Sequence, residues 1–320
     1  MVSTAIAFIV FNRPAQTAQT FAAIKAERPR QLFIIADGPR PGHPSDAQRC
    51  AAVRALVSQV DWPCDVHREF ADANLGCKQR VSSGLDWVFG QVERAIVLED
   101  DCLPHRDFFS FCDAMLEHYA EDERVWVVTG NNFQDGQRHG NGSYYFSKFS
   151  HCWGWASWRR AWTHYDSEIT FWPQWQASQH WQELTPDLIE RQHWERLFDR
   201  AYRKKVDTWD YQWMASVWYH RGLTATPNVN LVRNIGFGED ATHTRSTRNK
   251  LADLTTKPLG ELTHPRHVEQ NVAADAYVFD HALGGRQQRW PRSLLMRPHR
   301  LAAAVARRIR QHQSRDIGRS

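Results

Sequence analysis

Residues 95–101 read Ala95-Ile96-Val97-Leu98-Glu99-Asp100-Asp101, a short apolar run followed at once by three acids. The apolar run is typical of a buried strand, and ligands of open α/β sheets bind beyond the carboxyl ends of such strands. Three neighbouring carboxylates repel one another unless a cation lies among them, and their hard oxygens favour Mg²⁺ or Mn²⁺. We therefore predict a divalent metal site here, suited to stabilising a leaving diphosphate. A solvated acidic loop is the alternative.

Short β-rich runs alternate with helical patterns on both sides of this stretch. We predict strands at residues 5–11, 31–36, 64–70, 94–98 and 125–129. We predict helices at residues 15–25, 47–59, 78–89 and 106–119. Such alternation is typical of an α/β fold with a mostly parallel, doubly wound sheet joined by right-handed crossovers. From residue 131 the pattern is less regular and richer in aromatic residues.

Composition favours a globular protein of the cytoplasm. The 320-residue chain is 42% hydrophobic, which is enough for a sizeable core. Its first eleven residues resemble a strand more than a secretory signal, and no apolar stretch of about 20 residues suggests a spanning helix. The six cysteines lack zinc-ligand spacing, so we expect reduced thiols. We predict a cytoplasmic location, with a peripheral position at the inner face of the cell membrane.

The membrane expectation comes from a basic tail at residues 284–320. This tail contains ten Arg and one acid, Asp316, although the whole chain has a formal charge of only +4. Leu301, Val305 and Ile309 recur every four residues among the Arg residues, so a short helix could lie on an anionic membrane surface. A disordered, solvated tail is the alternative. Because the basic residues are in a tail and not spread over a folded face, we expect no nucleic-acid partner.

Five short motifs occur in an ordered series over residues 5–243. They are Phe11-Asn12-Arg13-Pro14, Ala36-Asp37-Gly38-Pro39, Asn74-Leu75-Gly76, Leu98-Glu99-Asp100-Asp101 followed by Phe108-Phe109, and Cys152-Trp153-Gly154-Trp155. The series resembles N-acetylglucosaminyltransferase I and related bacterial transferases of the GT-A fold. In that family the acid triplet is a variant of the D-x-D motif.

The resemblance implies a role for each residue of two groups. It implies that Asp101 ligates the metal, that Asp100 contacts the ribose or its neighbours, and that Glu99 supports the site. It also implies that Arg13 and Asp37 hold the nucleotide base. From the residues alone, a surface Arg beside a strand and an ordinary Asp-Gly turn are the alternatives.

Two further segments are candidates for binding the substrates. Lys78 and Arg80 lie at the start of a predicted helix, where they could neutralise a diphosphate, although a solvated helix face explains them equally well. Trp153, Gly154 and Trp155 could form a wall of the donor or acceptor pocket, because indole faces stack on sugar rings. Core packing is the alternative for these aromatic residues.

The general base is predicted in the segment Asp207-Thr208-Trp209-Asp210-Tyr211-Gln212-Trp213. An acid close to Trp rings is partly desolvated, which raises its pKa toward values that suit a base. Asp210 resembles the catalytic acid of the transferases above, but the spacing to the second Trp differs by one residue. Asp207 therefore stays an alternative. His243, at the end of a Gly-rich loop, is a candidate ligand of the metal or diphosphate, and a structural His is the alternative.

These features predict a metal-dependent, inverting glycosyltransferase. The resemblance implies a nucleotide diphosphate sugar donor, with UDP favoured, and a carbohydrate or glycolipid acceptor of the kind used in bacterial surface polysaccharide synthesis. Residues 1–130 would bind the nucleotide sugar and residues 131–283 the acceptor. The alternatives are a noncatalytic carbohydrate-binding or scaffold protein at the membrane surface, and a metal-dependent phosphohydrolase.

Overall fold

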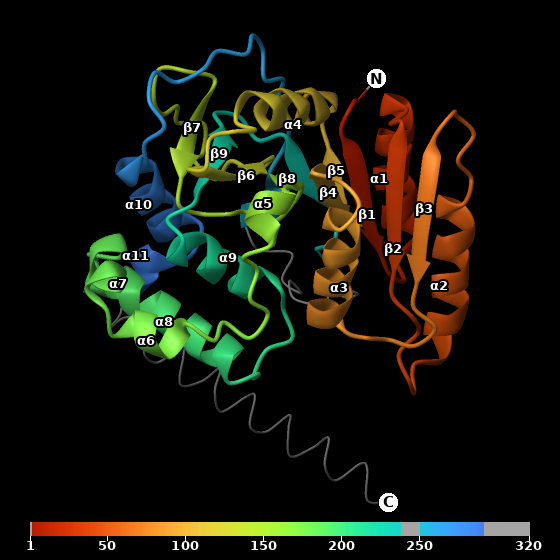
Figure 1. The fold of residues 1–320 in the computed structure, drawn as a ribbon, viewed down its shortest axis with the longest axis horizontal. Coiled ribbons are helices and arrows are strands. Elements are labelled where there is room, and N and C mark those ends of the chain that lie inside the picture. The colour runs from red at the N-terminus through yellow and green to blue at the C-terminus, as the bar shows by residue number, and fades with distance from the viewer. Residues whose placement is uncertain (1, 238–249, 291–320) are drawn as a thin grey trace, which may run out of the picture.

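The computed structural model describes residues 2–237 and 250–290, which contain one eight-stranded sheet and one two-stranded sheet (Figure 1). The strand order of the large sheet is β3-β2-β1-β4-β8-β6-β9-β7. Six of these strands run in one direction, whereas β8 and β7 run the opposite way. The structure thereby confirms the predicted α/β fold class, with a mostly parallel, Rossmann-like sheet flanked by helices.

The first half of the sheet is a parallel block. It consists of β1 (Ala5–Val10), β2 (Gln31–Ala36), β3 (Asp65–Phe70) and β4 (Arg94–Glu99). Its connections are α1 (Pro14–Glu27), α2 (Pro44–Val57) and α3 (Cys77–Phe89). Strand β1 is buried on both faces, with Ala7 and Ile9 in one core cluster and Ile6 and Phe8 in the other. Such continuous burial explains why β1, β2 and β4 appear in the sequence as apolar runs without alternation, whereas β3 is only partly buried.

The second half continues the same sheet with shorter strands. They are β6 (Val125–Thr129), β7 (Tyr144–Ser147), β8 (Trp155–Trp158) and β9 (Leu223–Pro227). Strand β8 lies between β4 and β6 and is antiparallel to both, so it joins the two halves. Helix α4 (Arg106–His118) packs with α1 and α2 on one face of the sheet. All five predicted strands and all four predicted helices are present, with ends that differ by at most three residues.

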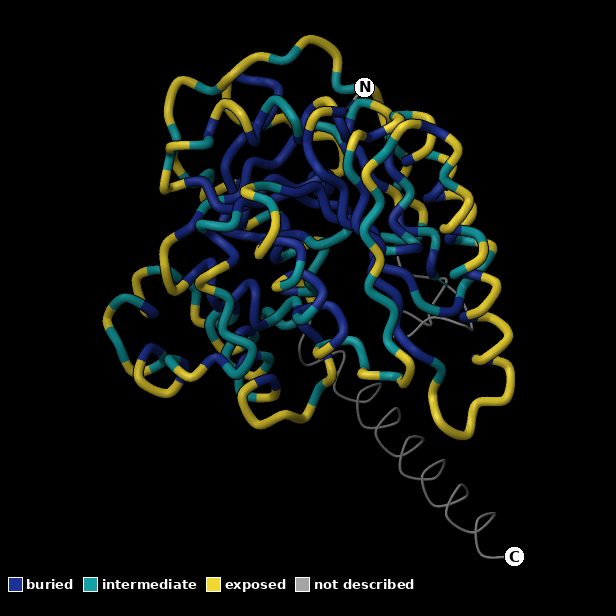
Figure 2. Tube along the Cα trace, turned by 45° about the vertical axis from the view of Figure 1, so that its right-hand side comes forward, coloured by how far each residue is buried: buried dark blue, intermediate teal, exposed yellow. Residues whose placement is uncertain are grey.

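The opposite face is covered by α3 together with a helical region rich in Trp. This region contains α5 (Arg159–Trp162), α6 (Trp172–Gln176), α7 (Gln179–Leu184), α8 (Leu188–Tyr202) and α9 (Asp210–Tyr219). The fully buried Trp side chains are Trp155, Trp172, Trp181, Trp213 and Trp218. Figure 2 shows the buried strands in the centre and exposed chain on the outer loops and helices. Most of the unusual Trp content of the described chain therefore stabilises a core.

A small second sheet brings a distant segment back to the acid triplet. It pairs β5 (Cys102–Pro104) with β10 (Val232–Asn234) in antiparallel orientation. The remaining elements are the 3₁₀ helix η1 (Lys250–Asp253) and the helices α10 (Val272–His281) and α11 (Gly285–Gln288). Among the described helices, none has the length and apolarity needed to cross a bilayer. Most of the predicted basic tail, from residue 291, lies outside the described residues.

Candidate active site

The acid triplet lies at the carboxyl end of β4, as its sequence predicts. Glu99 is the last residue of the strand, and Asp100 and Asp101 follow it. The Asp100 carboxylate accepts a hydrogen bond from the Phe11 N–H at 3.1 Å, and its carbonyl accepts one from the Thr20 hydroxyl at 3.0 Å. Asp100 is thereby buried against the β1–α1 connection. These contacts hold the triplet, at the end of β4, against the segment that follows the neighbouring strand β1.

Arg13 faces the triplet from the start of α1. Its Nη1 lies 2.6 Å from Asp101 Oδ2 and 3.9 Å from Asp100 Oδ1. Burial opposes the charged form, but the nearby negative charges of Asp100 and Asp101 raise the Arg13 pKa overall. Arg13 is therefore part of the acidic centre and not a surface residue. Its predicted contact with a nucleotide base stays a prediction.

Negative charge dominates this centre. Burial, and then the charges of Asp101, Asp100 and Asp210, raise the pKa of Glu99 to about 8, and the Arg13 charge opposes this shift. Burial and the charge of Asp101 also raise the pKa of Asp100. Within residues 2–237 and 250–290, no group of three or more His, Cys, Asp or Glu side chains has an arrangement that could hold a metal ion. The residue types nevertheless fit a hard divalent cation, which prefers carboxylate oxygens. Three acids, Asp101, Asp100 and Asp210, act on Glu99, and Arg13 is the cation that opposes them.

The raised pKa of Glu99 makes stability depend on pH. Folded Glu99 keeps its proton up to about pH 8, whereas its ordinary pKa is 4.5. Between these values the folded state binds more protons than the unfolded state, so the free energy of unfolding falls as pH rises. With EDTA present to remove divalent metal ions, we expect Glu99 to lower the free energy of unfolding by up to about 1.4 kcal/mol for each pH unit. Denaturant unfolding of wild type and Glu99→Gln from pH 5.5 to 8.5 measures it, and parallel curves would contradict it.

Asp210 lies beside the triplet although the two segments are far apart in sequence. It is the first residue of α9 and is half-buried. Its charge contributes to raising the pKa values of Glu99, Cys152 and Tyr211, which places its carboxylate near all three. The Thr208 hydroxyl donates a hydrogen bond to Asp210 Oδ1. The fold therefore brings this predicted base to the predicted metal site.

Asp207 has a different position and different partners. It is exposed, and it accepts hydrogen bonds from the Cys77 N–H at 3.0 Å and the Lys78 N–H at 2.9 Å. These are the first amides of α3, which need acceptors from outside the helix. A Cβ added to Gly76, which has φ 82°, would lie 2.8 Å from Asp207 Oδ2. Asp207 is thus an N-terminal cap for α3, supplied by a segment 130 residues away.

This cap gives a prediction for stability. We expect Asp207→Ala to lower the free energy of unfolding by about 1 kcal/mol, because two helix amides lose their acceptor. Activity per folded molecule should stay within a few-fold of wild type. Urea unfolding and active-site titration measure both quantities. A collapse of turnover without loss of stability would give Asp207 a direct role in the chemistry.

Asp37 also holds the loop that leads into α3. Its oxygens accept hydrogen bonds from the Gly38, Leu75 and Gly76 N–H groups and from the Asn74 amide, at 2.8 to 3.2 Å. Burial raises the Asp37 pKa, although these hydrogen bonds act in the opposite direction. Because both oxygens already bind the chain, Asp37 has a structural task here. Its contact with a nucleotide base stays a prediction.

The two cations at the start of α3 are paired within the protein. Lys78 Nζ lies 2.7 Å from Glu168, which is also 2.6 Å from Lys204. Arg80 is buried, and its Nη2 lies 2.7 Å from Glu69. The alternative explanation, in which these cations lie on a solvated face of the helix, is therefore wrong for Arg80. Neither pairing supports the predicted contact with a diphosphate, which stays untested.

The Trp-Gly-Trp motif divides between the core and a partly open position. Trp155 is 1% exposed and stacks on Trp209, with ring centroids 5.5 Å apart, so core packing describes it better than a pocket wall. Trp153 is half-buried and meets Phe133 and Phe237 edge to face. Gly154 has φ 70°, and a Cβ there would approach Val232 to 2.7 Å. Trp153 is therefore the member of this motif that a ligand could reach.

The segment after β10 covers the triplet, a contact that the sequence reasoning missed. The Ile235 N–H donates to the Asp101 carbonyl at 2.8 Å, and the Gly236 N–H donates to Asn234 Oδ1 at 2.8 Å. A Cβ at Gly236 would overlap the Asp101 carboxylate. The Gly236-Phe237-Gly238 sequence is the signal from which a close approach of this kind could have been predicted. His243, the predicted ligand on this loop, lies outside the described residues.

Comparisons with known proteins concern the fold alone. No protein-family model and no curated protein matches the sequence. Mouse xyloside xylosyltransferase 1 in its apo form is 10% identical with a TM-score of 0.34, over 69% of this chain and 84% of that chain. UDP-glucose pyrophosphorylase complexed with UDP-glucose is 8% identical with a TM-score of 0.30, over 51% and 79%. The 4-diphosphocytidyl-2C-methyl-D-erythritol synthase of Anaerococcus prevotii is 8% identical with a TM-score of 0.31, over 55% and 78%. Likeness of this degree carries no argument about function, which depends on the residues of the site.

Proposed function

We propose that this protein is a metal-dependent, inverting glycosyltransferase. It would move a sugar from a nucleotide diphosphate sugar, with UDP favoured, to a hydroxyl of a carbohydrate or glycolipid acceptor. One observation carries the proposal. The carboxylate of Asp210 is close enough to the acid triplet for its charge to raise the pKa of Glu99, at the carboxyl end of β4, where ligands of α/β sheets bind.

The carboxylates would hold a divalent cation, Mn²⁺ or Mg²⁺. Asp101 is the principal ligand in this proposal, because its side chain is less enclosed than that of Asp100 and lies against Arg13. Glu99 and Asp100 would supply further carboxyl oxygens behind it, because a bound cation favours the ionised form of both. When bound, the cation would stabilise the negative charge of the diphosphate as it leaves. Arg13 would exchange part of its contact with Asp101 for the incoming phosphate oxygens.

Asp210 would act as the general base. Its carboxylate accepts the proton of the acceptor hydroxyl while the hydroxyl oxygen forms a bond to the anomeric carbon. The bond between that carbon and the diphosphate oxygen breaks, and the nucleoside diphosphate leaves with the electron pair. A single displacement inverts the anomeric configuration. The Thr208 hydroxyl, which already donates to Asp210, would keep the carboxylate in position.

The noncatalytic carbohydrate-binding alternative has less support. Such a protein would present Trp faces to solvent for sugar stacking. Among the described Trp residues, Trp290 is the one that is largely exposed, at 78%. The other large hydrophobic side chains that are exposed are Leu75, Leu188, Tyr202, Tyr219 and Val272, and none of them is a Trp. A buried set of Trp residues stabilises the fold and offers no such surface.

Transfer is tested by the release of nucleoside diphosphate from a panel of sugar donors. The assay contains Mn²⁺ or EDTA, with and without short carbohydrate acceptors. The proposal expects release that needs both Mn²⁺ and an acceptor for at least one donor. Release that is equally fast without an acceptor would instead indicate a hydrolase. Binding of carbohydrate without any release would support the noncatalytic alternative.

Membrane association through the basic tail, residues 284–320, is a separate part of the proposal. We expect the full chain to bind vesicles that contain anionic lipid at low salt, because Arg clusters are attracted to such a surface. A chain that lacks residues 290–320 should lose this binding and keep its activity on a soluble acceptor. Vesicle sedimentation measures the binding. Equal binding by the shortened chain would contradict the prediction.

A further inference from the structure

A cavity of about 230 Å³ lies away from the acid triplet. Its walls combine charged and polar side chains from α7, from the end of α9 and from the segments around them. The residues that matter for its chemistry are Lys148, His180, Glu183, Trp218, Arg221 and Gln270. None of these residues has a part in the proposed transfer reaction.

The cavity is at the opposite edge of the sheet from the candidate active site. Strand β7, which precedes Lys148, is antiparallel to β9, and β9 runs in the same direction as β6. The end of β7 therefore lies beside Leu223, the first residue of β9, which also lines the cavity. The cavity is thus at the amino ends of the parallel strands, whereas the acid triplet is at the carboxyl end of β4. Helix α9 connects the two places. Asp210 and Trp218 are eight residues apart on it, or about 12 Å along the helix axis.

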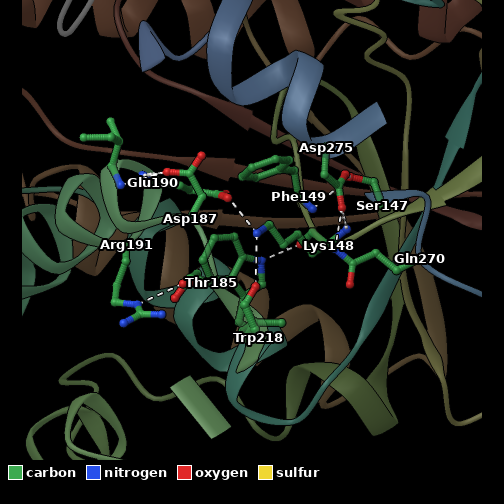
Figure 3. Close-up of polar contacts among 12 residues, drawn as sticks. Ser147, Lys148, Phe149, Thr185, Asp187, Glu190, Arg191, Trp218, Gln270 and Asp275 are labelled. Atoms are coloured by element: carbon green, nitrogen blue, oxygen red, sulfur yellow. Dashed lines mark hydrogen bonds and ion pairs between the residues drawn. The ribbon is translucent and has the colours of Figure 1, made fainter. Parts of the chain in front are cut away.

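Lys148 is a buried cation at this cavity (Figure 3). Its Nζ lies 2.9 Å from Glu190 Oε1, and the two side chains are 5% and 8% exposed. It also donates to the Leu184 carbonyl at 3.3 Å, and it lies 5.0 Å from the Trp218 ring centroid. Burying such a pair is costly, so its value for stability alone is small. An ammonium group has three donors, and within the described chain these two oxygens are its partners.

The backbone of Lys148 is fixed from two sides. Its N–H donates to Asp275 Oδ2 at 3.2 Å, and its carbonyl accepts from Trp218 Nε1 at 2.5 Å. Gln270, another wall residue, donates to the same Asp275 oxygen at 2.7 Å. Figure 3 shows Lys148 between these groups, which come from separate elements. A cation held in this way is preorganised, which is what a binding site requires.

Arg221 supplies a second cation at the outer side of the cavity. It follows α9 with φ 58°, a left-handed conformation in which Gly is the favoured residue. Its Nε lies 3.2 Å from His180 Nε2. Burial and the Arg221 charge lower the His180 pKa, so this ring is neutral at pH 7. Glu190 pairs with Lys148, and Glu183 is the acid among the residues that line the cavity.

We infer that this cavity binds a small molecule that carries an oxyanion, either a carboxylate or a phosphate. Its oxygens would lie between the third donor of Lys148 and the guanidinium of Arg221, with Gln270 as a neutral polar contact. The volume corresponds to about eight water molecules at about 30 Å³ each, which limits the ligand to a small one. This inference is independent of the proposed transferase activity.

Isothermal titration calorimetry of the full chain tests the inference with three probes. Glucuronate carries a carboxylate on a sugar ring, inorganic phosphate carries the other oxyanion, and glucose is the neutral counterpart of glucuronate. At matched ionic strength we expect at least one of the two anions to bind and glucose not to bind. The highest anion concentration in the titration is roughly 10 mM, which would still detect weak specific binding. If neither anion binds at that concentration, the inference is overturned.

Charge variants locate the bound anion. Arg221→Gln should weaken binding about fivefold, because two unit charges about 4 Å apart in water interact by about 1 kcal/mol. Glu183→Gln removes a repelling charge and should strengthen binding by a similar factor. Arg68→Gln, an equally exposed Arg on β3, is the matched control and should change nothing. The double variant Lys148→Gln/Glu190→Gln removes both buried charges together and should abolish binding. Unchanged affinity in both single variants, or loss of binding in Asp101→Ala, would place the anion elsewhere and overturn the inference.

Discussion

Asp210→Asn is expected to lower the rate of sugar transfer by about two to four powers of ten while donor affinity stays close to wild type. The Asn side chain keeps the shape of Asp and can still accept the hydrogen bond from Thr208, but it cannot take the proton of the acceptor hydroxyl. Turnover at saturating donor and acceptor, together with the donor dissociation constant, measures the two effects separately.

The matched control for this prediction is Asp207→Asn, three residues earlier. Asp207 caps α3 and does not face the triplet, so its variant should be less stable and nearly as active per folded molecule. If the losses are reversed between the two variants, the base is Asp207. If both variants keep normal turnover, this segment has no part in the mechanism.

Asp101→Ala should abolish transfer and raise the dissociation constant of the donor in Mn²⁺ by about a hundredfold or more, since even an outer partner of a metal ligand is worth about 10- to 100-fold. The fold should survive, because the change relieves repulsion with Glu99 and Asp100. Arg13 keeps Asp100 nearby, at 3.9 Å. Donor titrations in Mn²⁺ and in EDTA, with thermal unfolding as the check on folding, give the result.

Glu99→Gln separates the metal ligand from the group behind it. The change replaces a carboxyl group that stays protonated up to about pH 8 with a neutral amide and leaves the Asp101 oxygens in place, so donor binding should fall much less than in Asp101→Ala. An Asp101→Ala protein that still binds donor in a metal-dependent way would show that another residue is the principal ligand.

The fold of the first half could be predicted from the sequence for a physical reason. Strands that are buried on both faces appear as apolar runs, and the acids after β4 appear as an abrupt change of polarity. The second half offered weaker signals. Strands β7 and β8 have four residues each, which is too short to show a period, and their aromatic residues fit a core and a ligand pocket equally well. The position of Trp155 therefore depended on the tertiary structure.

The roles of individual acids needed contacts between distant segments. Asp207 and Asp210 look alike in sequence, and only the amides of Cys77 and Lys78, about 130 residues away, identify Asp207 as a cap. The same holds for Asp37, whose Asp-Gly sequence is consistent with a turn but does not reveal four donors from two loops. Arg13 and Asp101, 88 residues apart, form an ion pair for which neither local sequence gives a signal.

The central claim, a metal-dependent site for a nucleotide sugar at the end of β4, is tested most directly by calorimetric titration of UDP-sugars and other nucleotide sugars into the full chain in Mn²⁺ and in EDTA. The account predicts that at least one donor binds in Mn²⁺, and that EDTA and Asp101→Ala each remove this binding. Donor binding that is equally tight in EDTA, or no binding of any nucleotide sugar in Mn²⁺, would contradict it.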